Sequence, residues 1–187
     1  MIIGVFGISG VGKTTICTNL QNTMTNVVRV SASEIIRKYG GLVDYEVLSN
    51  SNLDTNQKLL VEGVKMLKNS NQTLPNPVTY LLELHSVLET PNGLQKIGVD
   101  VFRELSLDWV VFLAKPESEI ATQRLMDSMR VRVESSVDDL RTLQLVAKQH
   151  FESTFSFLDI PLNIIVAEHT QNFQHLIESA HTSHYSD

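Results

Sequence analysis

The stretch Gly7–Thr14 reads GISGVGKT and fits the pattern G-x-x-x-x-G-K-[ST] with no mismatch. In this phosphate-binding loop, or P-loop, glycines let the backbone come close enough for successive N–H groups to point at phosphate oxygens. Lys13 is placed to reach the β- and γ-phosphates of a nucleotide, and the hydroxyl of Thr14 to bind magnesium. The helix that follows adds its positive N-terminal end to the same site. The residues expected to hold the nucleotide are Gly10, Val11, Gly12, Lys13, Thr14 and Thr15.

The segments on either side of the loop have the order that such a loop requires. Residues 1–6 form an apolar run that predicts a buried strand, and residues 15–20 have the apolar spacing of a helix packed on a sheet. Further apolar runs predict four more strands, at about 27–30, 78–82, 107–113 and 162–166. Strands that alternate with helices pair in parallel through crossover connections. The sequence therefore predicts a three-layer α/β/α sandwich with a five-stranded parallel sheet, which is the P-loop NTPase fold.

The composition is that of an ordinary globular domain and argues against two classes of partner. The chain has 187 residues, of which 42% are hydrophobic and 19% charged, and this suits one domain with its own core. The net charge of −6 argues against a surface for nucleic acid or an anionic membrane, since either would need a basic face. No apolar run approaches the ~20 residues that span a bilayer, and the chain begins with a core strand rather than a signal peptide. Together with the single cysteine, Cys17, these features predict a cytoplasmic protein.

Three polar segments are expected to meet at one edge of the sheet. Ligands of parallel α/β sheets bind at the carboxyl ends of the strands. The P-loop follows the first strand, residues 31–33 follow the second, and residues 83–86 follow the third. A P-loop alone indicates only a bound nucleoside triphosphate, but the N-K-x-D and D-x-x-G signatures of GTPases do not occur in the sequence. Small-molecule kinases, which need an acceptor pocket and cations beside the P-loop, remain.

Residues 31–37 read SASEIIR and are similar to the S-T-G-D-x-L-R segment that opens the monophosphate-binding helices of adenylate kinases. With the P-loop, this segment gives the chain a resemblance to nucleoside monophosphate kinases of the adenylate kinase type, from Met1 to about Val166. The chain looks nearer the compact, short-lid forms. The resemblance implies one kinase domain over residues 1–187, with a monophosphate-binding helical segment at about 33–72 and a short lid at about 126–136.

The resemblance also implies an activity and its cofactors. The chain would transfer the γ-phosphoryl group of ATP, bound with Mg²⁺, to a nucleoside monophosphate, with AMP or dAMP favoured. The sequence indicates neither a membrane nor a nucleic-acid partner, and it leaves the oligomeric state open. Two other functions also remain open: a P-loop kinase or ATPase that acts on another acceptor, and a non-catalytic protein that senses a nucleotide.

On the acceptor side, the resemblance implies roles for Ser33, Arg37 and His85. Arg37 would hold the acceptor's phosphate, since an arginine in the first turns of a helix can offer a bidentate fork to a phosphate. Ala32 and Ser33 replace the Thr and Gly of the family segment, and Val87 stands where the family has an arginine. His85 either points into the pocket in place of that arginine or is a hydrogen-bonded structural histidine.

On the donor side, the resemblance assigns charged residues to the metal and to the transferred phosphoryl group. Glu83 takes the place of the acidic residue that orients magnesium through water. Arg124, Arg130 and Arg132 resemble the lid arginines, which close over the γ-phosphoryl group and stabilise the charge on its oxygens. The expected catalytic residues are Lys13, Arg124, Arg130 and Arg132, and the expected magnesium site is Thr14 with Glu83.

Overall fold

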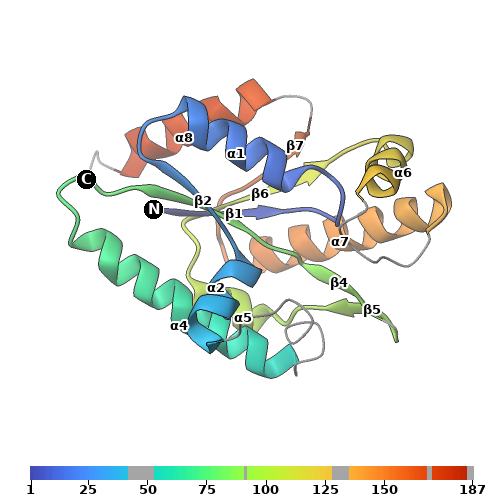
Figure 1. The fold of residues 1–187 in the computed structure, drawn as a ribbon, viewed down its shortest axis with the longest axis horizontal. Coiled ribbons are helices and arrows are strands. Elements are labelled where there is room, and N and C mark those ends of the chain that lie inside the picture. Colours follow the sequence, from blue (N-terminus) through green and yellow to red (C-terminus); the bar gives the residue numbers. More distant parts are fainter. Residues whose placement is uncertain (42–52, 91, 128–134, 168–169, 185–187) are drawn as a thin grey trace.

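The computed structural model describes residues 1–41, 53–90, 92–127, 135–167 and 170–184. Its elements are β1 (Ile2–Phe6), α1 (Lys13–Thr23), β2 (Val27–Ser31), α2 (Ala32–Gly40), α4 (Leu53–Gln72), β3 (Thr79–Glu83), β4 (Val87–Thr90), β5 (Gly93–Lys96), α5 (Val99–Leu105), β6 (Trp109–Ala114), α6 (Glu117–Met126), α7 (Val137–Phe157), β7 (Leu162–Val166) and α8 (Thr170–His184). Five parallel strands form the main sheet in the order β2–β3–β1–β6–β7. Helices α1 and α8 lie on one face of this sheet, and α5 and α7 lie on the other (Figure 1). The predicted three-layer α/β/α sandwich with a five-stranded parallel sheet is confirmed.

The central strand β1 is the middle of the hydrophobic core. All its residues are buried, because it pairs with β3 on one side and β6 on the other, and helices cover both faces. On the face of α5 and α7, Phe6 contacts Phe102, Phe151 and Phe155, with ring centroids 5.0–5.5 Å apart. Tilted and edge-on ring contacts of this kind add about 0.5–1.5 kcal/mol each beyond the burial itself. The core therefore gives the P-loop, which follows β1 directly, a rigid base.

The register of the parallel strands brings the predicted site segments together. Glu83 at the end of β3 pairs with Ser31 of β2 on one side and with Val5 of β1 on the other. Helix α2 starts directly after β2: the Ser31 side chain accepts the N–H of Glu34, and the Glu34 carboxylate accepts the N–H of Ser31. Gly41 ends the helix in the left-handed conformation, with φ 63°. Helix α2 is thus capped at both ends by residues of its own segment.

The helical segment expected at about 33–72 contains α2 and α4, which pack against each other (Figure 1). Gly63 of α4 permits their close approach, because a Cβ atom there would lie 2.2 Å from Ile35 Cγ2 and 2.6 Å from Tyr39 Cδ2. Residues 42–52, between the two helices, lie outside the described residues. The assignment of this segment to the acceptor stays a prediction.

The lid expected at about 126–136 lies mostly outside the described residues. Helix α6 ends at Met126, and residues 128–134 are not described. Ser136 caps the N-terminus of α7 through reciprocal hydrogen bonds with Asp139.

Within the described part of the chain, no helix combines the length and apolar character needed to cross a membrane.

A hairpin and a short helix between β3 and β6 are missing from the sequence-based prediction. Strands β4 and β5 form an antiparallel hairpin that is not hydrogen-bonded to the main sheet, and the short helix α5 follows them. The sequence T-P-N-G at residues 90–93 is a turn signal that could have revealed the hairpin. Helix α5 has only 7 residues, too few for a clear helical periodicity. Both elements contribute side chains to the cleft beside the P-loop.

Candidate active site

A cleft of about 1100 Å³ opens at the carboxyl ends of β1, β2 and β3, as expected for a parallel α/β sheet. Its volume is slightly above the range of about 300–1,000 Å³ that is usual for a single small-molecule pocket, which leaves room for two ligands. We call the part around the P-loop the phosphate end; it is lined by Gly10, Gly12, Lys13, Thr14, Thr15 and Glu83. We call the part formed by α2, α4, α5 and the hairpin the acceptor lobe; its apolar lining includes Ile36, Leu60, Leu84, Leu88, Ile97 and Phe102.

The P-loop has the backbone that its glycines predict. Gly10 and Gly12 have φ values of 86° and 101°, in the left-handed region that side chains disfavour. Lys13 is the first residue of α1, and its Nζ donates to the carbonyl oxygens of Gly7 at 2.7 Å and Ile8 at 3.1 Å. The first turn of α1 contains no acidic residue that would oppose an anion. A cation and a helix N-terminus therefore converge on one anion-binding loop.

Thr14 and Glu83 form the oxygen pair expected for magnesium. Thr14 Oγ1 donates to Glu83 Oε2 at 2.8 Å, and Glu83 is only 8% exposed. Magnesium prefers oxygen ligands and takes one or two from the protein, while substrate phosphates and water supply the others. The pair fits that donor set without a larger acidic cluster. Within the described residues, no group of three His, Cys, Asp or Glu side chains could hold a metal ion.

Arg29 of β2 extends this contact into a chain of charges that the sequence analysis did not assign. Its Nε donates to Glu83 Oε1 at 2.5 Å, and its Nη1 donates to Glu34 Oε1 at 3.1 Å. Burial opposes the charge of Arg29, but the two carboxylates outweigh it and raise the pKa of the guanidinium. Burial also opposes the charge of Glu34, but hydrogen bonds from Ser31 and Arg29 lower the pKa of its carboxyl. A lone arginine in the otherwise uncharged run Val27–Ser31 was the available signal, because a charge that becomes buried needs a partner.

The structure brings Arg124, the first of the three expected catalytic arginines, to the P-loop. Its Nε donates to the carbonyl oxygen of Ser9 at 2.9 Å. Its Nη1 and Nη2 donate to the two carboxylate oxygens of Glu89, on β4, at 3.1 and 2.8 Å. Glu89 lines the cleft, whereas Arg124 is not among the described residues that line it. The sequence-based prediction contained neither Glu89 nor its hairpin. The other two arginines, Arg130 and Arg132, lie outside the described residues, and their roles stay predictions.

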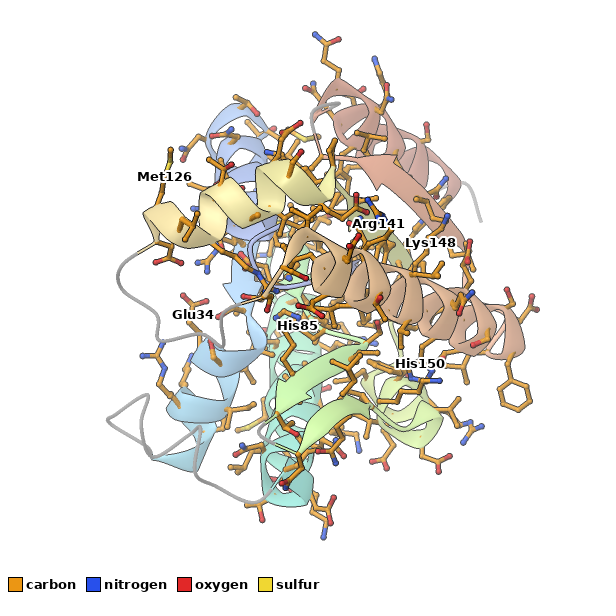
Figure 2. The ribbon with its side chains drawn as sticks, turned by 90° about the vertical axis from the view of Figure 1, so that its right-hand side faces the viewer. Glu34, His85, Met126, Arg141, Lys148 and His150 are labelled. Atoms are coloured by element: carbon orange, nitrogen blue, oxygen red, sulfur yellow. The ribbon has the colours of Figure 1, made fainter. Side chains whose placement is uncertain are left out.

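Two of the three expected acceptor residues, Ser33 and His85, line the cleft. Ser33 Oγ lies 3.0 Å from Ser31 Oγ at the start of α2. Figure 2 shows His85 and Glu34 on the same side of the molecule, below α6. Arg37 lies one turn beyond Ser33, donates its Nε to the Ser33 carbonyl oxygen at 3.3 Å, and is not among the described residues that line the cleft. A role of Arg37 in binding the acceptor's phosphate stays a prediction.

Polar side chains interrupt the apolar lining of the acceptor lobe at a few points. Asn56 and Gln57 come from the first two turns of α4, and Gln95 comes from β5. An amide side chain offers both donors and an acceptor, so it can match a ligand edge that presents both. The lobe can therefore enclose an apolar group that carries hydrogen-bonding atoms.

Shikimate kinases are among the solved structures with the same fold. The enzyme from Acinetobacter baumannii, in complex with shikimate, is 16% identical, with a TM-score of 0.63 over 95% of this chain and 93% of that chain. The enzyme from Bacteroides thetaiotaomicron is 12% identical, with a TM-score of 0.59 over 95% and 98%. The enzyme from Aquifex aeolicus is 13% identical, with a TM-score of 0.58 over 100% of both chains. At these identities the likeness establishes a shared fold.

Sequence comparison places the chain in a family. A search of curated proteins finds no match. The profile of a family described as an AAA domain matches residues 6–141, which is more than half of the chain. The matched region contains the P-loop together with Arg29, Glu83 and Arg124. The chain therefore belongs to the AAA domain family and has the fold of P-loop kinases.

Proposed function

We propose that this protein is a kinase that transfers the γ-phosphoryl group of ATP, bound with Mg²⁺, to a nucleoside monophosphate. One observation carries this proposal: the P-loop and the acceptor lobe face the same cleft of about 1100 Å³. A protein that only hydrolysed or sensed ATP would not need a second lobe beside the phosphates. Phosphoryl transfer to a small acceptor is consistent with the fold, which shikimate kinases share.

The lining of the acceptor lobe favours a nucleobase. A base has flat apolar faces and an edge that carries both hydrogen-bond donors and acceptors. Leu60, Leu84 and Phe102 supply buried apolar surface, and Gln57 and Gln95 supply amides. Among the bases, adenine is favoured by the family resemblance alone, so AMP and dAMP are the first acceptors to test.

In this proposal the residues position two nucleotides and balance charge. The phosphate of the acceptor is already ionised, so no protein base or nucleophile is required. Lys13 and the backbone of the P-loop bind the donor's phosphates, and Arg124 lies beside the loop, where it can join them. When bound, magnesium neutralises phosphate oxygens, and Thr14 and Glu83 would hold it. Arg29 orients the Glu83 carboxylate.

A P-loop kinase or ATPase that acts on another acceptor is the second candidate. Ala32 and Ser33 depart from the segment typical of adenylate kinases, and Val87, at the position of the family's arginine, is a buried residue of β4. The Acinetobacter baumannii structure of the same fold holds shikimate, which makes that compound a useful probe. A non-catalytic nucleotide sensor is the third outcome that an experiment has to separate.

A coupled assay of ADP formation separates the three functions. ATP and Mg²⁺ are supplied with AMP, dAMP, the other common monophosphates, shikimate, or no acceptor, and Lys13→Ala serves as the control for contaminating activity. We expect one monophosphate to stimulate ADP formation and to be recovered as a diphosphate. Stimulation by shikimate alone, or ADP formation without any acceptor, supports the second candidate. ATP binding without ADP formation under every condition supports a sensor.

A further inference from the structure

Arg124 and Glu89 form an ion pair at the edge of the phosphate end. Both terminal nitrogens of the guanidinium donate to the carboxylate, at 3.1 and 2.8 Å, so the pair is bidentate. The Arg124 side chain is 8% exposed and the Glu89 side chain 32% exposed. Glu89 also lines the cleft. A carboxylate thus lines a cleft whose phosphate end is built for anions.

Arg124 has its own attachment to the P-loop, which does not involve Glu89. Its Nε donates to the Ser9 carbonyl oxygen at 2.9 Å. Its stem lies against Gly10, where a Cβ atom would be 2.8 Å from Arg124 Cγ. These contacts hold the arginine beside the loop, so Glu89 is not needed to bring it there.

The carboxylate of Glu89 makes the same kind of contact that a phosphate would make. A guanidinium presents a planar fork that matches a carboxylate and a phosphate equally well. Glu89 belongs to the hairpin β4–β5, which is not hydrogen-bonded to the main sheet, so its carboxylate can move away without breaking that sheet. A nucleotide whose phosphates reach Arg124 must therefore displace Glu89 or share the guanidinium with it.

We propose that Glu89 sets the affinity for the nucleotide by competing with its phosphates for Arg124. This inference rests on the proposed binding of ATP at the P-loop and does not depend on which acceptor is used. Competition lowers affinity, because binding must first break the Arg124–Glu89 pair and bring phosphates near a second negative charge. An anchoring role of Glu89 predicts the opposite sign, because an anchor raises affinity by holding Arg124 in place. The sign of the change in affinity therefore decides between the two roles.

The experiment measures ATP binding by calorimetry in the presence of Mg²⁺ and without an acceptor. We expect Glu89→Gln to bind ATP about fivefold more tightly than the wild type, given the energy of a partly exposed ion pair. The matched control is Glu119→Gln on α6, which removes a carboxylate from the pair with Lys115 at the molecular surface. This control should bind ATP within about twofold of the wild type. Unchanged or weaker ATP binding by Glu89→Gln overturns the proposal.

A double-mutant cycle tests whether Glu89 acts through Arg124 rather than through its charge alone. In an Arg124→Met background there is no guanidinium to compete for, so Glu89→Gln should change ATP affinity by less than about twofold. An equal gain in affinity in both backgrounds overturns the proposal, because it identifies a general charge effect. Thermal unfolding of each variant checks that every protein compared is folded. If the wild type binds ATP but phosphorylates no acceptor, the proposed kinase function is wrong. The test of ATP affinity still applies in that case.

Discussion

The phosphate end and the acceptor lobe of the cleft differ in what holds them together. At the phosphate end, polar contacts place each functional group: Lys13 is bound to backbone oxygens, and Glu83 is bound to Thr14 and Arg29. In the acceptor lobe, apolar side chains from α2, α4, α5 and the hairpin form the walls, with Gln57 among the few polar groups. The first region is specified by hydrogen bonds and charge, and the second by shape. Substitutions at the two ends should therefore affect different kinetic and thermodynamic quantities.

The largest expected effect is at the phosphate end. Lys13→Ala should lower kcat/KM by at least about 100-fold, because it removes a cation that neutralises charge during transfer, which costs ~2.7 kcal/mol or more. Steady-state kinetics with the best acceptor measure the loss. Lys65→Ala is the matched control, since Lys65 pairs with Glu104 at the surface. If the Lys13 variant kept more than about a tenth of the wild-type rate, the assignment of the P-loop lysine would be wrong.

The second expected effect concerns stability at the phosphate end. Arg29→Met leaves Glu83, which is buried, and Glu34 without their common cation, so the free energy of unfolding should fall by about 2 kcal/mol. Urea unfolding at neutral pH measures the change. Arg103→Met, which breaks an exposed pair with Asp100, should cost less than about 0.5 kcal/mol. If the two variants lost equal free energy of unfolding, the Arg29 contacts would contribute no more to stability than an exposed ion pair.

The third expected effect is smaller and belongs to the acceptor lobe. Gln57→Leu should raise the KM for the acceptor about fivefold, because it removes one hydrogen-bonding side chain from the lining. The affinity for ATP should not change, since Gln57 lies on α4 and not on the P-loop. Gln72→Leu, at the exposed end of the same helix, is the control. If Gln57→Leu lowered the affinity for ATP and left the acceptor KM unchanged, Gln57 would belong to the donor site. The assignment of donor and acceptor to the two ends of the cleft would then be wrong.

The contrast between the two ends also explains what could be predicted from the sequence. One continuous stretch, Gly7–Thr14, carries the P-loop, and regular apolar runs carry the five parallel strands, so both were predicted correctly. The contact of Glu83 with Thr14 follows once the strands are placed. Arg29 and Glu89 were missed because their roles come from partners 54 and 35 positions away in the chain. Spacing within one segment says nothing about such partners.

The acceptor lobe was the least predictable region for a related reason. Its walls come from α2, α4, α5 and the hairpin, and two of these four elements carry no strong periodic signal. The helix α5 is short, and the strands of the hairpin have 4 residues each. Phe102 and Leu88 look like ordinary core residues in the sequence, and only the fold shows that they also face a cleft. Which apolar side chains line a cleft depends on how the helices and strands are arranged in space. A local sequence pattern does not contain that arrangement.

The smallest expected effect concerns the pH dependence of stability where the phosphate end joins α2. Hydrogen bonds from Ser31 and Arg29 lower the pKa of Glu34 below its ordinary value of 4.5. A carboxyl whose pKa is lower in the folded state stabilises the fold above its unfolded pKa, and this contribution is lost as the pH falls through the folded value. The wild type should therefore be more stable than Glu34→Gln at neutral pH, and the difference should shrink in acid.

Glutamine can keep the reciprocal cap with Ser31, so the comparison isolates the charge. Urea unfolding midpoints of both proteins, taken between neutral and acidic pH, measure this difference in stability. In an Arg29→Met background the difference in stability should be smaller at every pH, because one of the hydrogen bonds to Glu34 is gone. A difference that grows as the pH falls would contradict the direction of the pKa shift and, with it, the role of Arg29 as the cation shared by Glu34 and Glu83.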